Sequence, residues 1–434
     1  MDSPPTDDIK HTADPYVITE ITHEEEISDN HSMKHTQETV TKAIPVIDYY
    51  ENEVYSKEIP ILMRGIQLVK YGNLTESLQY SEGIPVPKLD HKKSQILVQV
   101  KAAGVNPIDV KVASGNIKFA TYALSLPTVI GADFAGFVVD KTDKVVDFDI
   151  GDHVCGTQRF PFTSHGTHAE YTLVDIHDAT VAKKPKAIPF ETAAAAGVAV
   201  IAAYKGIIEQ GSIDDANKQE KRSIIIVGAS GGVGNYALQL SRLINRDNTV
   251  IAICSAKNAD INLSFGATKT IDYNNKEEFE EFVKASEHQE AFDIILDCVG
   301  SNEYFDKLSR LVKKKDGVYC STVGLLEYFG SHGKFSFSAA LKLLCKIGYR
   351  SMTLNGRYTV LNTLTGNSSD ILKKKILPII ENKRLIAPIV TGHSTKIVAP
   401  IISNNSIIPL KYAHEAYKKI LTNHTYGKII LTID

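Results

Sequence analysis

The sequence predicts an α/β protein in which a barrel-like, all-β domain precedes a domain built on a parallel sheet. Three observations lead to this expectation. β-rich segments, separated by connectors that contain proline and glycine, continue to about residue 188. From residue 223 onwards, strand-like segments alternate with helix-like segments of ~10 residues, which is typical of βαβ units. A glycine turn lies where the first of these strands meets the first of these helices.

The first 58 residues are polar and acidic. They contain 14 acidic and 4 basic side chains, a net charge of −10, which leaves +7 for the rest of a chain whose total is −3. Such a segment buries too little apolar surface to offset the entropy that is lost on ordering. We therefore expect a disordered tail over residues 1–58.

The β-rich region starts near Ile59. Its strand-like segments are 63–71, 96–103, 129–140, 152–156 and 168–174. Short strands that follow one another without intervening helices are typical of a barrel or sandwich. They predict one compact barrel-like domain.

The alternating region opens with an apolar, helix-compatible run at 190–208. Strands are then expected at 223–227, 249–254, 268–273, 293–297 and 318–322, and helices at 234–244, 257–265 and 277–285. The run Ile-Ile-Ile-Val at 224–227 is continuously apolar, which indicates a sheet that is covered on both faces. After about residue 362 the pattern is mixed again, and it ends in a strand at 427–432.

The glycine pattern Gly228-x-x-Gly231-x-x-Gly234 directly follows one predicted strand and opens a predicted helix. Glycines in this context let backbone N–H groups approach a pyrophosphate, and the helix N-terminus adds unpaired donors and a favourable dipole. We therefore predict a dinucleotide site that contains Gly228, Ser230, Gly231, Gly232, Val233 and Gly234.

The end of the following strand favours a phosphorylated cofactor. An Asp or Glu at this point would hold a ribose 2′-hydroxyl, but this chain has Ser255 and Lys257 and no carboxylate. A hydroxyl and an ammonium would bind a 2′-phosphate. The predicted cofactor is NADPH rather than NADH; the alternative for Lys257 is a solvated lysine at the start of a helix.

Composition excludes several classes of protein. The five cysteines are scattered without metal-ligand spacing, as expected in a reducing compartment, and we expect a cytoplasmic protein. No basic stripe with interleaved aromatic residues indicates nucleic-acid binding. No uncharged apolar run reaches the ~18–20 residues of a membrane-spanning helix. The lysine-containing amphipathic segment 339–349 fits either an anionic membrane surface or packing at a domain interface.

Several motifs occur in the order that is found in one enzyme family. They are Ala-Ala-Gly-Val-Asn-Pro-Ile-Asp at 102–109, Gly-Ala-Asp-Phe-Ala-Gly at 131–136, Gly-Asp-His-Val at 151–154, the glycine turn, Phe-Gly-Ala at 265–267, Ile-Asp-Tyr at 271–273, Asp-Cys-Val-Gly at 297–300 and Gly-Lys at 427–428. On these motifs the chain resembles the medium-chain dehydrogenases/reductases of the quinone-oxidoreductase branch. The resemblance implies a GroES-like β-barrel domain that is split in sequence (59–188 and 362–434) and an inserted Rossmann domain (189–361) with a doubly wound parallel sheet.

The same resemblance implies roles for individual residues. Asn106 would contact the substrate or the nicotinamide amide, and Lys111 would steady a developing enolate. Tyr273 would lie beside the 2′-phosphate, and Val299 belongs to a motif of the cofactor-binding domain. Relatives are often dimers, so a homodimer is expected.

The resemblance also implies that no metal is bound. Zinc-dependent relatives have a Cys near Asn106 and a His-Glu pair at the positions of Ala132 and Asp133, and a catalytic zinc needs three protein ligands. Without a Lewis acid the substrate should already be electrophilic: a quinone or an α,β-unsaturated carbonyl that accepts hydride from NADPH.

One departure leaves a second class of function open. Relatives have a Thr near the nicotinamide where this chain has Ala202, so that a positioned hydroxyl is lost. The length, the acidic extension and this loss are also similar to a fungal subgroup, the Ast proteins, which associate peripherally with membranes and help to deliver the plasma-membrane proton ATPase. In that case the fold would be a binding module for an anionic membrane surface or a membrane-protein client. A mitochondrial reductase is the third alternative, although the acid-rich N-terminus is unlike a transit peptide.

Overall fold

The computed structural model describes residues 58–115, 124–159, 161–163, 165–287, 291–322, 337–361, 368–382, 384–385, 406–422 and 424–434, together with 19–20 and 40–41. The chain divides into two compact units, Met1–Asn52 and Glu53–Asp434. In the first unit, β1 (Thr19–Glu20) pairs antiparallel with β2 (Val40–Thr41). The rest of the predicted tail lies outside the described residues, apart from Glu58 at its end.

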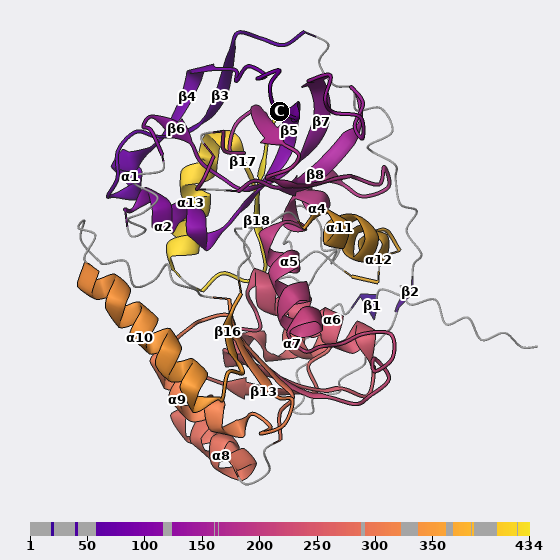
Figure 1. The fold of residues 1–434 in the computed structure, drawn as a ribbon, viewed down its shortest axis with the longest axis vertical. Helices are drawn as coiled ribbons and strands as arrows, with labels where there is room; N and C mark the ends of the chain where they lie inside the picture. Colours follow the sequence, from indigo (N-terminus) through magenta and orange to yellow (C-terminus); the bar gives the residue numbers. More distant parts are fainter. Residues whose placement is uncertain are drawn as a thin grey trace, which may run out of the picture. The chain divides into compact units, whose positions relative to one another are not determined.

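Two sheets, antiparallel except for the parallel pair β17 and β18, build the barrel domain of the second unit (Figure 1). One sheet has the order β4-β3-β6, and the other has the order β10-β8-β7-β5-β18-β17, with β9 also paired to β5. The strands are β3 (Leu62–Leu68), β4 (Leu78–Pro85), β5 (Gln95–Val105), β6 (Thr128–Val129), β7 (Asp133–Lys141), β8 (His153–Thr157), β9 (Tyr171–Asp175), β10 (Thr180–Lys183), β17 (Ile407–Pro409) and β18 (Ile429–Thr432). Inward-facing side chains such as Ile96, Val98 and Phe134 form one core, which gives the predicted GroES-like domain.

The end of the chain returns to this domain. In Figure 1 the yellow strand β18 lies beside the indigo strand β5, with Ile429 opposite Val105 and Thr432 opposite Ala102. The helices of the domain are α1 (Leu74–Ser77), α2 (Pro107–Ala113) and α13 (Ala413–Leu421), and α11 (Ser369–Ile371), η5 (Leu372–Ile376) and α12 (Leu377–Glu381) follow the α/β domain. The barrel is therefore split in sequence, as predicted.

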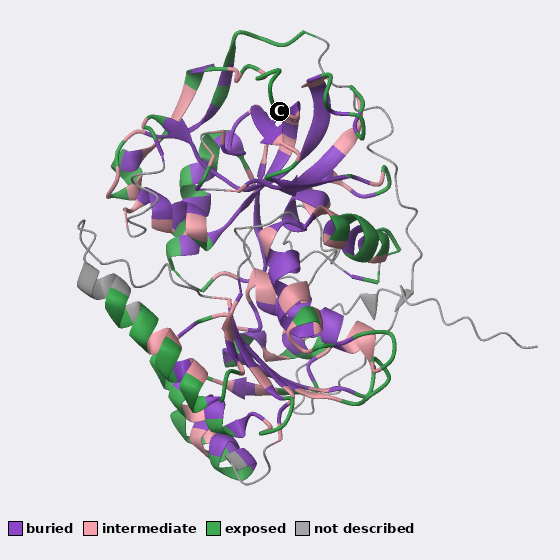
Figure 2. Cartoon of the chain, viewed as in Figure 1, coloured by how far each residue is buried: buried purple, intermediate pink, exposed green. Residues whose placement is uncertain are grey.

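A six-stranded parallel sheet forms the α/β domain. Its order is β13-β12-β11-β14-β15-β16, which reverses between β11 and β14 as in a doubly wound Rossmann fold. The strands are β11 (Ser223–Val227), β12 (Thr249–Cys254), β13 (Lys269–Asp272), β14 (Ile294–Asp297), β15 (Val318–Ser321) and β16 (Tyr358–Val360), and the helices are α6 (Gly232–Ile244), η2 (Ala256–Asn258), α7 (Ala259–Ser264), α8 (Lys276–Glu287), α9 (Asn302–Leu308), η3 (Ser309–Leu311) and α10 (Phe337–Thr353). The four inner strands, β12, β11, β14 and β15, are almost entirely buried, as Figure 2 shows, because helices cover both faces of the sheet.

The apolar run at 190–208 is broken, although the sequence predicts one helix-compatible segment. It forms α4 (Phe190–Ala195), α5 (Val198–Tyr204) and the π-helical η1 (Lys205–Glu209). The break is caused by Asp133, whose Oδ1 accepts a hydrogen bond of 2.9 Å from the Val198 N–H. A Cβ on Gly197 would lie 2.0 Å from the same oxygen, so only glycine fits there.

The prediction of one strand over 129–140 is also wrong, because this segment forms two strands that belong to two different sheets. Val129 ends β6, which pairs with β3, whereas Asp133 starts β7, which pairs with β5 and β8. Gly131, with a φ of 104°, changes the direction of the chain between them.

Candidate active site

One cavity of about 540 Å³ lies between the barrel and the parallel sheet. Every predicted site residue lines it: Asn106, Lys111, Gly228, Ser230, Gly231, Gly232, Val233, Gly234, Ser255, Lys257, Tyr273 and Val299. No Asp or Glu does so among the residues that the structure describes. The wall is therefore suited to an anionic ligand.

The glycine turn forms one side of the cavity, at the point where the strand order reverses. Gly228 leaves β11 with a φ of 72°, and Gly231 precedes the first residue of α6. A Cβ on Gly234 would lie 2.4 Å from the carbonyl oxygen of Gly228, so the close approach of helix and turn requires glycine. The N-terminus of α6 thus presents unpaired backbone N–H groups to the cavity, which suits a pyrophosphate.

The next strand places the predicted phosphate-binding residues at one end of the cavity. Ser255 and Lys257 follow β12, and Tyr273 follows β13, which pairs with β12. No hydrogen bond or ion pair joins the Ser255 hydroxyl or the Lys257 ammonium to another described residue. Both groups are therefore available to a ligand.

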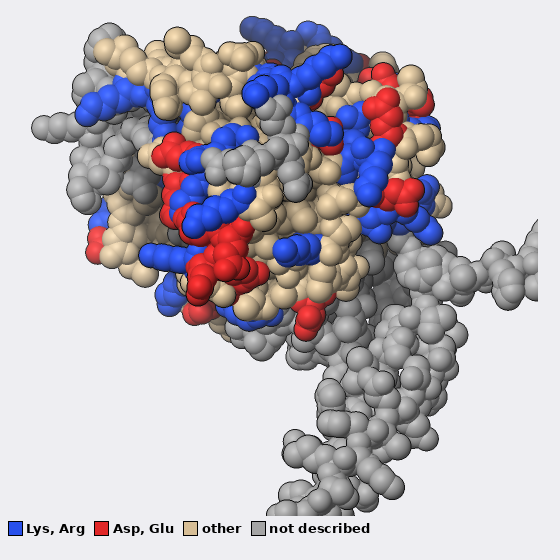
Figure 3. Space-filling model, turned by 90° about the horizontal axis from the view of Figure 1, so that it is seen from below, with Lys and Arg blue, Asp and Glu red and all other residues tan. Residues whose placement is uncertain are grey.

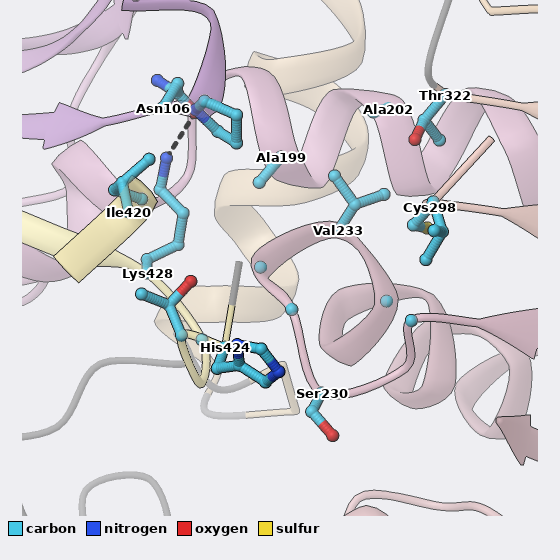
Figure 4. Close-up of a pocket in the computed structure, with 18 of the residues that line it drawn as sticks. Asn106, Ala199, Ala202, Ser230, Val233, Cys298, Thr322, Ile420, His424 and Lys428 are labelled. Atoms are coloured by element: carbon cyan, nitrogen blue, oxygen red, sulfur yellow. Dashed lines mark hydrogen bonds between the residues drawn. The ribbon is translucent and has the colours of Figure 1, made fainter. Parts of the chain in front are cut away.

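Small and apolar side chains line the middle of the cavity. Ala199 and Ala202 of α5 lie opposite Val233, and Thr322 and Cys298 lie beyond them (Figure 4). Burial raises the pKa of the Cys298 thiol to about 12, so it stays protonated at neutral pH and is a poor nucleophile. The Thr322 hydroxyl is a polar group on this wall.

Asn106 lies at the opposite end of the cavity with its amide engaged in the protein. Its Oδ1 accepts a hydrogen bond of 2.7 Å from Lys428 Nζ (Figure 4), and its Nδ2 donates one of 2.9 Å to Asp133 Oδ2. Lys428 Nζ also donates to Asp133 Oδ2, at 2.9 Å. Contact of Asn106 with a substrate or a nicotinamide amide stays a prediction, and it would compete with these bonds.

A second buried polar group lies behind Asn106. Asp109 Oδ2 accepts the Asn106 N–H at 2.7 Å, while burial raises the pKa of the Asp109 carboxyl to about 8. His168 lies 3.9 Å from Asp109 and bonds to the Tyr417 hydroxyl at 2.8 Å, and burial lowers the pKa of its imidazole to about 4. At neutral pH both side chains are therefore uncharged.

Several cavity residues have no predicted role, among them Thr322, His424 and Lys428. Lys428 belongs to the Gly-Lys motif at the end of the chain. Its contact with Asn106 could not be predicted from the sequence, because the two residues lie far apart along the chain. Thr322 and His424 lie in segments without a motif, so the sequence contains no signal that would select them.

Two family models match the chain: the alcohol dehydrogenase GroES-like domain at residues 92–186 and the zinc-binding dehydrogenase at residues 265–431. Together with the barrel, the Rossmann sheet and the cavity between them, these matches assign the chain to the medium-chain dehydrogenase/reductase family of nicotinamide-dependent oxidoreductases.

Individual relatives carry reductase names. The 2-methylene-furan-3-one reductase of Solanum lycopersicum is 33% identical over 62% of this chain and 64% of its own, so this chain spans less than two thirds of that relative. The chloroplastic NADPH-dependent alkenal/one oxidoreductase of Arabidopsis thaliana is 27% identical over 88% of this chain and 82% of its own. The structure of the quinone oxidoreductase from Coxiella burnetii has the same fold, with a TM-score of 0.66 at 23% identity over 86% of this chain and 100% of its own.

The residues at the position of a catalytic zinc do not fit that ion. Ala132 is apolar, Asn106 offers an amide, and the Asp133 carboxylate is paired with Lys428. Across the described ranges, no three or more His, Cys, Asp or Glu side chains are grouped so that they could hold a metal. A zinc site needs three such ligands.

Proposed function

We propose that this protein is an NADPH-dependent, zinc-independent reductase that transfers hydride to a quinone or an α,β-unsaturated carbonyl. The observation that carries the proposal is a single cavity that joins an unpartnered lysine, Lys257, to the glycine turn and then to Lys111 and Asn106. The names of the tomato and Arabidopsis relatives support the class of acceptor.

Each part of the cavity has one task in this proposal. Ser255 and Lys257 bind the 2′-phosphate, and the N-terminus of α6 binds the pyrophosphate. When bound, the nicotinamide supplies a hydride. Ala199 and Ala202 exclude water from the transfer, and Lys111 stabilises negative charge that develops on the acceptor oxygen.

Cofactor binding and turnover test the proposal separately. A fluorescence titration should show that NADPH binds more tightly than NADH. Oxidation of NADPH, followed by absorbance, should then accelerate with at least one of 1,4-benzoquinone, menadione, methyl vinyl ketone or trans-2-hexenal, and a zinc chelator should leave the rate unchanged. Equal affinity for NADH contradicts the cofactor assignment, and binding without turnover of any acceptor contradicts the reaction.

A second candidate function is supported by the outer face of α10. Leu341, Leu344 and Met352 are 51%, 62% and 79% exposed, whereas Ile347 and Arg350 pack toward the sheet. Figure 2 shows most of this helix in the colour of exposed residues. An apolar stripe of this kind supports the alternative of a peripheral membrane protein, for which α10 would enter the lipid surface.

Vesicle flotation tests this second candidate. No described helix is both long and apolar enough to cross a membrane, so binding would depend on α10 lying in the interface. Charges of both signs are interspersed on the face seen in Figure 3, which offers no large basic patch there to attract anionic lipid. The intact protein should float with phosphatidylserine vesicles at physiological salt, and Leu344→Ser with Met352→Ser should abolish flotation. Failure of the parent protein to float, or flotation that survives the double substitution, contradicts the candidate.

A further inference from the structure

Lys428 and Asp133 form a buried ion pair at the acceptor end of the cavity. Their side chains are 4% and 0% exposed, and Nζ lies 2.9 Å from Oδ2. The two members are not equivalent, because Lys428 lines the cavity and Asp133 does not. Lys428 thus lines the cavity with a nearly buried side chain, and its ammonium lies among Asn106, Asp133 and the Val105 carbonyl.

The ammonium is fixed in place by its partners. Nζ donates to Asn106 Oδ1 at 2.7 Å, to Asp133 Oδ2 at 2.9 Å and to the Val105 carbonyl oxygen at 3.4 Å. Asp133 is itself held by the Val198 N–H at the start of α5, where Gly197 leaves room for its carboxylate. A charge that is oriented before the substrate arrives needs little reorganisation during the reaction.

The stem of Lys428 lies against the cofactor turn. A Cβ on Gly232 would lie 2.9 Å from Cδ of Lys428, and the neighbouring Gly427 N–H donates to the Ser230 carbonyl oxygen at 2.9 Å. The same residue thus touches the turn that is expected to hold the dinucleotide and ends at the wall beside Asn106. A negative charge formed on an acceptor beside Asn106 would interact with the ammonium through its charge and not through a direct hydrogen bond, because all three N–H groups of Nζ already donate to the protein.

Asn106 and Asp133 both bind the ammonium of Lys428. We propose that Lys428 is the fixed positive charge that stabilises the developing oxyanion of the acceptor. This inference rests on the proposed reductase function.

The charge that Lys428 would stabilise follows from the reaction itself. The β-carbon of an enone gains a hydride from NADPH, the electron pair of the C=C bond moves to the carbonyl oxygen, and an enolate results. A water molecule then gives a proton to the α-carbon, so the products are the saturated ketone, NADP⁺ and hydroxide. The enolate oxygen is the site where negative charge is greatest, so a nearby cation lowers the barrier most when the cavity excludes water.

Binding of 4-nitrophenol to the NADP⁺ complex tests the charge without requiring turnover. The phenol and the phenolate differ in visible absorbance, so the pKa of the bound probe is measured directly. In the wild-type protein this pKa should fall by about one unit below its value in buffer, a roughly tenfold preference for the phenolate. Lys428→Met, which keeps the length of the stem, should remove the shift, and Lys428→Arg should retain most of it.

Two further variants separate the charge from the fold. Lys428→Met leaves a buried carboxylate without its partner, so Asp133→Asn with Lys428→Met removes both charges and should also lose the shift. Tyr426→Phe removes only the hydrogen bond of 3.1 Å to Asn235 in the same segment and should behave like the wild type. Circular dichroism and NADPH titration check that each variant is folded.

The outcomes distinguish this inference from the function on which it rests. A phenolate preference that survives Lys428→Met and the double substitution overturns the role of Lys428. So does failure of 4-nitrophenol to bind the wild-type complex. If the wild type reduces no acceptor, the reductase proposal fails on its own, while the probe still decides the charge. With an active wild type, the double variant should lower kcat for an enone roughly tenfold or more, with the Kd for NADPH changed less than about threefold.

Discussion

Two lysines of the cavity, Lys257 and Lys428, differ in their contacts, so we expect their substitution to have different effects on ligand binding and on stability. Lys257 has no described partner, whereas Lys428 is tied to Asn106 and Asp133. Loss of an unpartnered surface charge alters ligand binding and leaves the fold intact. Loss of a buried paired charge alters both, because the remaining partner is left without compensation.

Lys257→Met should therefore change cofactor preference without changing stability. A charge-assisted contact with a phosphate contributes about 1.5–3 kcal/mol, so the Kd for NADPH should rise roughly 10- to 150-fold, while the Kd for NADH should stay within about twofold. Fluorescence titration with both cofactors measures the effect. Lys373→Met, at an exposed position on η5, is the matched control and should leave both affinities unchanged. An equal loss of affinity for NADPH and NADH would contradict a specific contact with the 2′-phosphate.

The site residues that sequence could supply are those that lie close together along the chain. The glycine turn, Ser255 and Lys257 fall within one βαβ unit, whose geometry is known once its strands are recognised. The contact between Asn106 and Lys428 joins residues 322 positions apart, and no local pattern predicts it. The assignment of Asn106 as a ligand-binding residue omitted this partner for the same reason.

At the scale of elements, buried side chains decide where helices and strands end. The predictions for β11 and β12 agree with the structure to the residue, because each is a continuous apolar run bounded by polar or glycine residues. The run 190–208 has only the isolated Gly197 at its break, with alanine and valine on both sides of it, so the sequence marks the boundary weakly. The break depends on a carboxylate from β7, which the local sequence does not contain.

Two glycines provide a matched test of this conclusion. In Gly197→Ala the new Cβ would meet Asp133 Oδ1 at 2.0 Å, so the free energy of unfolding should fall by about 1–3 kcal/mol or more. In Gly348→Ala, within α10, the new Cβ would meet no atom within 4 Å, so the free energy of unfolding should rise by about 0.5–1 kcal/mol. Urea unfolding of both variants measures the difference. Equal stability of the two variants would show that the contact with Asp133 does not determine the break.

At the scale of the whole molecule, the buried side chains of Asp109 and His168 make the free energy of unfolding depend on pH. The Asp109 carboxyl has a folded pKa of about 8, above its ordinary value of 3.8, because it is buried. Its contribution to stability is therefore fully present below about pH 4 and is lost as the pH rises through 8. The His168 imidazole has a folded pKa of about 4, below its ordinary value of 6.5, so its contribution is present above pH 6.5 and is lost as the pH falls toward 4.

Asp109→Asn should flatten the alkaline side of the stability profile. Between pH 6.5 and 8 the wild type should lose up to about 1.4 kcal/mol of unfolding free energy per pH unit through this carboxyl, because one proton is released on unfolding. The variant keeps an oxygen that can accept the Asn106 N–H but has no proton to release. Urea unfolding at pH 6.5, 7.2 and 8.0 compares the slopes. Parallel slopes for the two proteins would contradict a neutral, buried Asp109.

The position of β18 has a consequence for protein synthesis. Its partner β5 leaves the ribosome about 320 residues earlier, as the 322 positions between Asn106 and Lys428 show. At a rate of ~5–20 residues per second, the Ala102–Val105 part of β5, which β9 does not cover on this edge, would remain without its partner strand for roughly 16–64 s. During that interval an unpaired apolar edge is open to other nascent chains. The order of synthesis therefore leaves the cavity incomplete until β18 has been added.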